Sequence, residues 1–494
     1  MEEQRKGFIQ ILKASSIFGG VQVVTIVFTI FRTKAAAMLL GPSGMGIVGL
    51  LSSSTDFFGA ATNFGLSTSA VRSLALAQDE DTEIDLARTI AIIKNLALTT
   101  GFVGMVVMIM FSNLLSKLVF DSLDYKWAFV ALSITLFLNQ LLASRTALIQ
   151  GFRKLPLLAL CTISNSAFSL LITVPLYYFF EKDGIVVALI LISVANFLGA
   201  LYFSSKIDYP RVKVDLLRSI KEGREILKLG FFIGFSGLLA LGSSYVLRLF
   251  INEVGSLDQV GLYNAGFAMI NTYVGLVFTA MTTDYFPRLS AAASQKSAFS
   301  DVVNHQMEIA FLLLGPILCW FIVLINPIVV FLYSDEFSAI NEMIVWSALG
   351  MLFKAIGWTL GYIILTKGSS SFFFRNELIA LTYQLALNLA GYYFMGLAGI
   401  GISFLIGYVI YAVQVIFVSY WKFPFIFDFK IIKKFVIFFG LITLALISFY
   451  LEDSPILRYS MGISVAVIAS FFSFKRLNTA LDLVTKINSL IKKK

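Results

Sequence analysis

Five basic side chains lie within long apolar stretches of the sequence: Arg32, Lys34, Arg145, Arg248 and Lys354. A cation in such surroundings is energetically costly and is usually kept to line a polar cavity or to meet a ligand. Guanidinium and ammonium groups bind phosphate and carboxylate groups. The five residues therefore predict an anionic substrate.

The stretches that contain these cations have the composition of membrane helices. The 494 residues are 58% hydrophobic and 14% charged, with 48 Phe, and the mean hydropathy is +0.86. A soluble domain does not hide so much apolar surface. Apolar runs near the roughly 20 residues that cross a bilayer predict an all-α polytopic membrane protein with about fourteen transmembrane helices. The expected spans are 9–39, 45–71, 91–116, 127–149, 156–180, 185–204, 229–252, 262–286, 306–333, 342–365, 376–397, 399–421, 434–451 and 456–474.

The remaining Lys and Arg residues are distributed unevenly along this pattern. Only Lys117, Lys126, Lys182 and Arg458 fall in odd-numbered loops, and the others lie at the termini or in even-numbered loops. By the positive-inside rule, both termini are expected to be cytoplasmic. The formal net charge of +9 is then mostly a topology signal, with the basic C-terminal tail against membrane lipids. It does not predict binding to nucleic acid.

An internal repeat predicts how the spans are grouped. The matched pairs are Lys34 with Arg248, Arg72 with Arg288, and Gly151 with Gly368. Their offsets lie between 214 and 217 residues, which suggests two pseudo-symmetric six-helix lobes in parallel orientation. The expected parts are an N-lobe (1–205), a cytoplasmic linker (206–228), a C-lobe (229–421), and two further helices with the basic tail (422–494). Two equivalent lobes are the usual scaffold for alternating access, so transport is the leading function.

Several stretches of the sequence also resemble those of a known family. They run from Arg32 to Gly49, Gln150 to Arg153, Val260 to Tyr263, Phe286 to Ser290, and Trp346 to Tyr362. Each stretch is loose by itself, and the specificity lies in their order. Together they resemble Wzx-type O-antigen and lipid-linked oligosaccharide flippases, members of the multidrug/oligosaccharidyl-lipid/polysaccharide (MOP) exporter superfamily.

The resemblance implies a MATE-like pair of six-helix bundles in the bacterial inner membrane. Such a protein moves an undecaprenyl-pyrophosphate-linked oligosaccharide, such as an O-antigen repeat unit, from the cytoplasmic to the periplasmic leaflet. The expected partners are this lipid-linked oligosaccharide, membrane lipids and polysaccharide-assembly proteins, and no cofactor is expected. A proton gradient, a sodium gradient and the membrane potential all remain open as the driving force.

The five cations differ in how strongly they predict contact with the pyrophosphate. Lys354 lies near the midpoint of its span, roughly 15 Å from either interface at 1.5 Å per residue, so it favours the cavity over a structural ion pair. Lys34 and Arg248 are repeat mates, with anchoring at the outer headgroups as the alternative. Arg32 lies about 200° from Lys34 around the helix; only one of them is expected to face the cavity, and Lys34 is preferred. Arg145 lies close to the inner end of its span, and positive-inside anchoring explains it adequately.

Four further charged residues carry weaker predictions. Arg72 and Arg288, at matched inner helix ends, suit a cytoplasmic gate or simple anchoring. Asp284 lies one turn from Arg288 and suits the same gate or a local ion pair. Asp56 is the acidic residue nearest the middle of a span. It predicts an ion-coupling site or a counter-ion for a cavity cation, with a hydrogen bond to neighbouring Ser and Thr as the alternative.

Other functions make different predictions. A MATE-like multidrug cation antiporter would share the two-lobe scaffold but typically has twelve helices and acidic sites. A lipid II flippase is a closer alternative, because it also has fourteen helices and an anionic substrate. A membrane glycosyltransferase or O-antigen polymerase would carry carboxylates on a large outer loop, and the predicted outer loops are short. No metal site is predicted, because Cys161 and Cys319 lie in apolar runs without ligand spacing.

Overall fold

The chain forms a protein of long helices. A computed structural model describes residues 2–80, 83–210, 212–293, 296–368, 370–423, 425–451 and 454–481, and no strand occurs among them. Eleven helical segments of this described part are long and apolar enough to cross a membrane. In lipid the backbone must satisfy its own hydrogen bonds, and a helix does so within one segment. The predicted all-α membrane fold is confirmed, while the predicted basic tail beyond residue 481 lies outside the described residues.

Two of the segments contain a sharp turn at a glycine. Gly41 has φ 63° and ψ −174° inside helix α1 (Glu2–Asn63), and Gly396 has φ 59° and ψ −141° inside α14 (Ser370–Lys422). Glycine adopts a positive φ without the steric cost that other residues meet. In α14 the chain folds back at this turn, since the Ser403 hydroxyl donates to Asn388 Oδ1 at 2.6 Å.

These turns explain how eleven helical segments can contain the fourteen predicted crossings. Each half of α1 and of α14 corresponds to one expected span, and the segment Leu155–Ser204 contains two helices, α5 (Leu155–Phe180) and α6 (Gly184–Ser204). The helices are therefore consistent with fourteen crossings.

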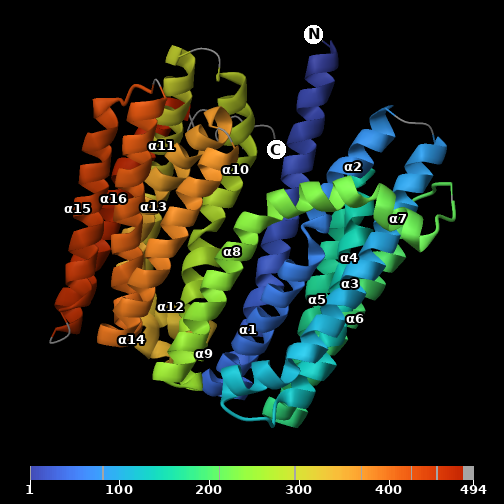
Figure 1. The fold of residues 1–494 in the computed structure, drawn as a ribbon. Helices are drawn as coiled ribbons and strands as arrows, with labels where there is room; N and C mark the ends of the chain where they lie inside the picture. Colours follow the sequence, from blue (N-terminus) through green and yellow to red (C-terminus); the bar gives the residue numbers. More distant parts are fainter. Residues whose placement is uncertain are drawn as a thin grey trace, which may run out of the picture. The chain divides into compact units, whose positions relative to one another are not determined.

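The first compact unit is Met1–Gly261. Besides α1, α5 and α6, it contains α2 (Leu66–Glu80), α3 (Glu83–Phe120), α4 (Lys126–Gly151), the short 3₁₀ turn η1 (Glu181–Asp183), α7 (Leu216–Glu222) and α8 (Arg224–Val254). Within this unit α1 packs against α5 and α8, α3 packs against α4, and α5 packs against α6. A buried cluster that includes Leu74, Ile93 and Leu148 joins α2, α3 and α4 (Figure 1).

The second compact unit is Leu262–Lys494. Its helices are most of α9 (Leu257–Ala268), the π-helical turn η2 (Met269–Val274), α10 (Leu276–Ala291), α11 (Lys296–Val323), α12 (Ile325–Leu332), the 3₁₀ turn η3 (Asp335–Ile340), α13 (Asn341–Lys367), α14, α15 (Phe429–Phe449) and α16 (Pro455–Leu481). Helix α13 packs along α14, and α11 packs against α15 and α16. The buried residues Phe311, Leu314 and Phe438 belong to this packing.

The two units do not divide the chain where the repeat does. The repeat assigns α8 to the second half, yet α8 packs against α1 and α2 inside the first unit. A helix that the repeat assigns to one half of the chain can still pack against helices of the other half. The repeat and the packing therefore group α8 differently. The predicted boundaries of the N-lobe, linker and C-lobe stay a prediction.

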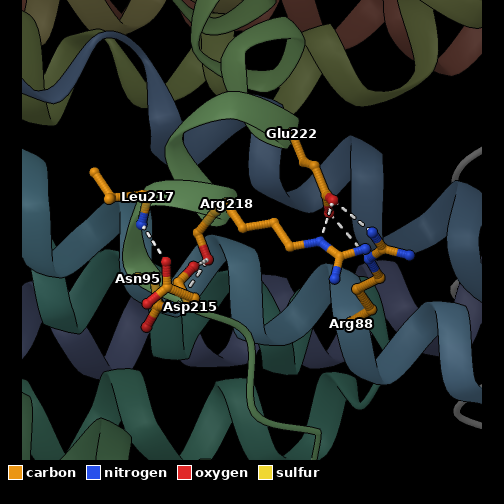
Figure 2. A network of polar contacts seen from close by, with 7 residues as sticks. Arg88, Asn95, Asp215, Leu217, Arg218 and Glu222 are labelled. Carbon is orange, nitrogen blue, oxygen red and sulfur yellow. Dashed lines mark hydrogen bonds and ion pairs between the residues drawn. The ribbon is translucent and has the colours of Figure 1, made fainter.

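The short helix α7 is tied to α3 by polar contacts. The Arg88 Nε and the Arg218 Nε donate to the Glu222 carboxylate at 2.9 and 2.7 Å, and Figure 2 shows both guanidinium groups converging on it. Asn95 Nδ2 donates to the Ser219 hydroxyl at 2.9 Å. The Asp215 carboxylate accepts from the backbone N–H two residues on and so caps the first turn of α7. These contacts fix the segment that precedes α8.

Glycine permits a close helix contact at the turn of α1. A Cβ on Gly46 would lie 2.0 Å from the Leu257 carbonyl oxygen, and a Cβ on Gly261 would lie 1.9 Å from the Pro42 carbonyl oxygen. Backbones approach this closely only where the side chain is a hydrogen atom. The turn therefore depends on a glycine on each of the two segments.

We expect Gly46→Ala to lower the free energy of unfolding by about 1–3 kcal/mol, because the added methyl group forces the backbones apart. Gly237→Ala is the matched control, since nothing lies within 4 Å of its Cβ position. The control should be neutral or stabilising by up to about 1 kcal/mol, as alanine favours a helix. Denaturant titration of the purified protein in detergent measures both. Equal effects of the two changes would contradict the close contact.

The ion pairs of α7 predict a dependence on pH. The hydrogen bonds from Arg88 and then Arg218 lower the pKa of Glu222 to about 2, from an ordinary value of 4.5. A carboxylate with a lowered folded-state pKa stabilises the folded state above its unfolded-state pKa, and this contribution is lost as the pH falls toward the folded-state pKa. We therefore expect α7 to stay docked at neutral pH and to loosen between about pH 4.5 and pH 2.

Hydrogen exchange at α7 measures this docking when Glu222→Gln is compared with the wild type at each pH, so that intrinsic exchange rates cancel. The variant should exchange faster at pH 7, and the difference should shrink below pH 4.5. Glu225→Gln is the control, because Glu225 has no recorded partner among the residues that the structure describes. A difference that persists unchanged down to pH 2 would exclude the ion pair as its cause.

Candidate functional site

Lys354 is surrounded by neutral groups of the second unit. Its Nζ donates to Asn271 Oδ1 at 3.0 Å and lies 5.3 Å from the ring centre of Tyr408, with the rings of Phe404 and Phe278 at 5.8 and 5.9 Å. Aromatic faces attract a cation within about 6 Å. No carboxylate pairs with this ammonium group among the described residues. The structure thus holds the cation in place without neutralising its charge.

Asn271 is positioned by an irregular turn. It lies in the π-helical segment η2, where the helix makes a wider turn than the α-helices on either side. A Cβ on Gly275 would come within 1.9 Å of the Asn271 carbonyl oxygen, so glycine is needed for this geometry. Single π-turns inside α-helices often occur at functional sites. Here the turn brings the amide of Asn271 to the ammonium group of α13.

An apolar cavity of about 650 Å³ lies on the same pair of helices, α13 and α14. Phe353, Ile356 and Leu360 line it from α13, and side chains of α11, α14 and α15 complete it. Apart from Ser419 and Tyr420, the lining side chains are apolar. The volume is within the roughly 300–1,000 Å³ of typical ligand pockets. The lining residue Phe353 is the sequence neighbour of Lys354, which does not itself line the cavity.

Asp56 lines a polar cavity of about 300 Å³ in the first unit. The other polar residues of its lining are Thr55, Thr62, Asn63, Ser67, Thr100, Asn139 and Gln140. Arg248 acts electrostatically on the Asp56 carboxylate, and its Nη1 donates to the Ser244 carbonyl oxygen at 2.9 Å. The oxygen-rich lining contains a single acid, and the roles of Asp56 as an ion-coupling site or as a counter-ion stay predictions.

Arg32 and Lys34, two residues apart on α1, are both partly buried. Arg32 lines a polar cavity of about 220 Å³ between α1, α5 and α6. Lys34 is not among the residues that line this cavity, as the predicted angle of about 200° between the two side chains requires. The preference for Lys34 over Arg32 as the substrate cation stays a prediction.

Arg145 lies in a basic cavity of about 490 Å³. Lys94 and Lys213 also line it, together with Ser204 and Tyr209. Three cations in one cavity suit a phosphate group. A role for Arg145 in binding the substrate stays a prediction, with positive-inside anchoring as the alternative.

The residues of the predicted cytoplasmic gate are close to the surface of the chain. Arg288 pairs with Asp284 at 2.8 Å, and both side chains are exposed. The Arg288 Nη2 also donates to Gln306 Oε1 at 3.2 Å, while Arg72 is exposed. The local ion pair is present, and a gating role stays a prediction.

Sequence reasoning missed the neutral partners of these charges. It did not single out Asn271 and Tyr408 beside Lys354, or Asn139 and Gln140 in the Asp56 cavity. An amide within an apolar span is itself a signal, because it needs a hydrogen-bond partner there. No group of three or more His, Cys, Asp and Glu side chains that could hold a metal occurs in the part of the chain that the structure describes.

Comparison with known proteins places this geometry in context. The model of a family described as polysaccharide biosynthesis protein matches residues 36–342. The lipid III flippase of Escherichia coli (strain K12) is 23% identical over 372 residues, which are 71% of this chain and 83% of that protein.

Two solved structures share the fold. The lipid II flippase MurJ in an inward closed conformation matches with a TM-score of 0.73 and 16% identity, covering 94% of this chain and 99% of that one. An inward-facing multidrug resistance MATE family transporter of the MOP superfamily matches with a TM-score of 0.64 and 15% identity, covering 82% and 97%. The predicted MOP-type fold is confirmed.

The contact between Lys354 and Asn271 predicts a measurable coupling. We expect Asn271→Leu to destabilise the protein by about 2 kcal/mol, because a hydrogen bond to a charged group contributes roughly 1.5–3 kcal/mol. Adding Lys354→Met should recover at least half of the loss, since the cation then no longer lacks its acceptor. Denaturant titration of the two single variants and the double variant measures the coupling. Additive effects would mean that the two side chains do not interact.

Proposed function

The chain belongs to the polysaccharide biosynthesis protein family, and from this premise we propose that it is a flippase for an undecaprenyl-pyrophosphate-linked oligosaccharide. The motifs quoted above favour the Wzx type within the MOP superfamily, with an O-antigen or related repeat unit as the substrate. The observation that carries the proposal is the Lys354 ammonium group, which lies on α13 near two aromatic rings of α14 and has no carboxylate partner among the described residues, while other residues of the same two helices line the apolar cavity.

The cation is the part of the site that selects the headgroup. A pyrophosphate that approaches Lys354 competes only with the Asn271 amide and with aromatic faces, which are weaker partners than a carboxylate. A multidrug antiporter for cationic drugs would instead need an acid at this place, because a like charge repels its substrate. The Lys354 surroundings therefore favour an anionic substrate over a cationic drug.

The apolar cavity suits the other end of such a substrate. A polyprenyl chain is long, unbranched in its overall course and devoid of polar groups, and the lining from Phe311 to Phe435 offers it aliphatic and aromatic contacts. The substrate is then recognised as an amphiphile, with its phosphates at a cation and its tail in apolar surroundings. A lipid II flippase would use the same chemistry, so it remains the second candidate.

The first unit carries further cations for the headgroup. Lys34 and Arg248 are proposed to contact the pyrophosphate during transport by alternating access. Arg145, with Lys94 and Lys213 in its cavity, is proposed to attract the phosphates from the cytoplasmic leaflet. This last role depends on the predicted orientation, in which both termini are cytoplasmic and the protein lies in the bacterial inner membrane.

Asp56 is the proposed coupling residue. Its cavity offers hydroxyl and amide oxygens for a proton or a sodium ion, and Arg248 lies close enough to act on its charge. An anionic headgroup at Arg248 would weaken the attraction between Arg248 and Asp56. Substrate binding and ion binding would then be linked through this pair.

Transport in proteoliposomes tests the proposal. The substrates are a fluorescent undecaprenyl-pyrophosphate oligosaccharide, fluorescent lipid II and a cationic drug. We expect the first to be flipped fastest and the drug not to move. Lys354→Ala should slow flipping about 10- to 100-fold, because a charge-assisted hydrogen bond contributes roughly 1.5–3 kcal/mol and 1.4 kcal/mol is a factor of ten. Lys354→Arg should retain part of the rate.

Lys126→Ala is the control for the loss of a cation, since Lys126 is at the start of α4 and lines none of the cavities described above. It should flip at the wild-type rate. Movement of the drug alone would replace the flippase by an antiporter. Faster flipping of lipid II would keep the mechanism and change the substrate. Equal rates for wild type and Lys354→Ala would remove Lys354 from the mechanism.

A further inference from the structure

Among the cavities described above, the cavity around Arg32 combines a cation with hydroxyl groups and amides and contains no acid. It lies inside the first unit, and its volume is about 220 Å³. The residues that line it are Phe28, Thr29 and Arg32 of α1, Thr162, Asn165, Ser166 and Ser169 of α5, and Asn196 of α6. Seven of the eight are polar, within helices that are otherwise apolar.

Arg32 enters this cavity without an acid to balance it. Neither an ion pair nor a hydrogen bond of Arg32 is recorded within the described residues. The one titratable side chain that acts on it electrostatically is the phenol of Tyr177, which is neutral at physiological pH. A buried cation is normally paired, because its desolvation is costly. The guanidinium group is therefore available to a ligand.

The hydroxyl groups of the cavity offer acceptors and not donors. Thr29, Thr162, Ser166 and Ser169 each donate to the backbone carbonyl one turn earlier, at distances of 2.8, 2.9, 3.1 and 2.8 Å. A hydroxyl group has a single proton, so what these groups can present to a ligand is their oxygen lone pairs.

The two amides add to this excess of acceptors. The Oδ1 atoms of Asn165 and Asn196 are buried and have no hydrogen-bond partner in the described part of the chain. Asn165 Oδ1 packs closely against Gly199, where a Cβ would lie 2.8 Å from it. Buried acceptors without donors are rare in proteins, and each one calls for an explanation. A ligand with O–H groups supplies the missing donors.

We propose that this cavity binds a single hydroxylated anion, either an acidic sugar or a sugar phosphate. The anionic group of the ligand pairs with the guanidinium group of Arg32. The hydroxyl groups of the ligand donate to the amide oxygens of Asn165 and Asn196. A metal cation is repelled by the guanidinium group, and a neutral sugar leaves it unpaired. The cavity is smaller than the roughly 300–1,000 Å³ of pockets for drug-sized ligands, which fits one sugar ring.

The inference rests on the proposed function, because it names one part of the glycan that the flippase would recognise. Two sources of the same chemistry exist: a carboxylated sugar within the repeat unit, and the sugar joined directly to the pyrophosphate. Arg32 with the two asparagines would then select the glycan, while Lys354 selects the lipid-linked phosphates that all such substrates share.

Binding of small probes to the purified full-length protein tests the inference. The probes are glucuronate, glucose 1-phosphate, glucose and inorganic phosphate, each titrated while the thermal midpoint is followed. We expect glucuronate or glucose 1-phosphate to bind at least about tenfold more tightly than glucose or inorganic phosphate, because only a hydroxylated anion satisfies both the cation and the amides. Preference for glucuronate indicates an acidic sugar, and preference for glucose 1-phosphate indicates the phosphate-linked one.

Variants separate the cation from the acceptors. Arg32→Gln should weaken binding of the preferred probe by about tenfold or more. It should not lower the thermal midpoint of the protein without probe, because the change removes an unpaired cation. Asn196→Ala should reduce the preference for the hydroxylated anion over inorganic phosphate. Lys126→Gln is the control for net charge and should bind as the wild type does. Equal binding by wild type and Arg32→Gln, or glucose binding as tightly as both glucuronate and glucose 1-phosphate, would overturn the inference.

These results are independent of transport. A protein that binds the acidic probe through Arg32 but flips no lipid-linked oligosaccharide would retain the site and refute the proposed function. A protein that flips its lipid substrate while Arg32→Gln changes no probe affinity would retain the function and refute the site.

Discussion

The scarcity of water along the spanning helices is the constraint on which the rest of this structure depends. A backbone N–H or a charged side chain in such surroundings must find its partner within the protein or on a ligand. Most polar side chains of the helices meet this demand locally: serine and threonine hydroxyls donate to carbonyl oxygens one turn earlier, as Thr100 does to Leu96. Two charged groups of the described residues do not, and the proposals above rest on them. Lys354 has neutral partners only, and Arg32 has no recorded partner in the described part of the chain.

The same constraint explains how much of the fold could be predicted. Apolar runs of spanning length must become helices, and many expected spans coincide with one, including the two halves of α14 that meet at Gly396. The expected span 262–286 instead contains the π-helical turn η2, and 306–333 covers both α11 and α12. Glycine content alone does not reveal which glycine takes a positive φ. It is the fold-back contact from Ser403 to Asn388 that identifies the turn. Likewise the repeat assigns α8 to the second half of the chain, and only packing shows that α8 contacts α1 and α2.

There is a physical reason why the candidate sites could be predicted only in part. A single charged residue within an apolar run can be recognised from the sequence alone, so Lys354, Arg32 and Asp56 could be selected. A binding site also needs the neutral groups that surround the charge, and these come from distant segments. Asn271 is 83 residues from Lys354, and it reaches the ammonium group because a π-helical turn shifts its register. The 3.6-residue period that underlies sequence analysis does not describe such a turn. The apolar cavity was also invisible, since apolar lining residues do not differ in type from those that face lipid.

If the proposed function holds, the cavities divide the recognition of an amphiphilic substrate among different helices. The apolar cavity and the Lys354 ammonium group share α13 and α14, so one helix pair presents an uncharged surface and a cation. The acceptor-rich cavity of Arg32 is built from α1, α5 and α6, and the acid Asp56 lies further along α1 in a cavity of its own. A small cationic drug would need none of this separation, because one acid in an aromatic pocket suffices to hold it. A molecule with a lipid tail, phosphates and sugars presents three unlike surfaces. Cavities with three unlike linings are what its recognition requires.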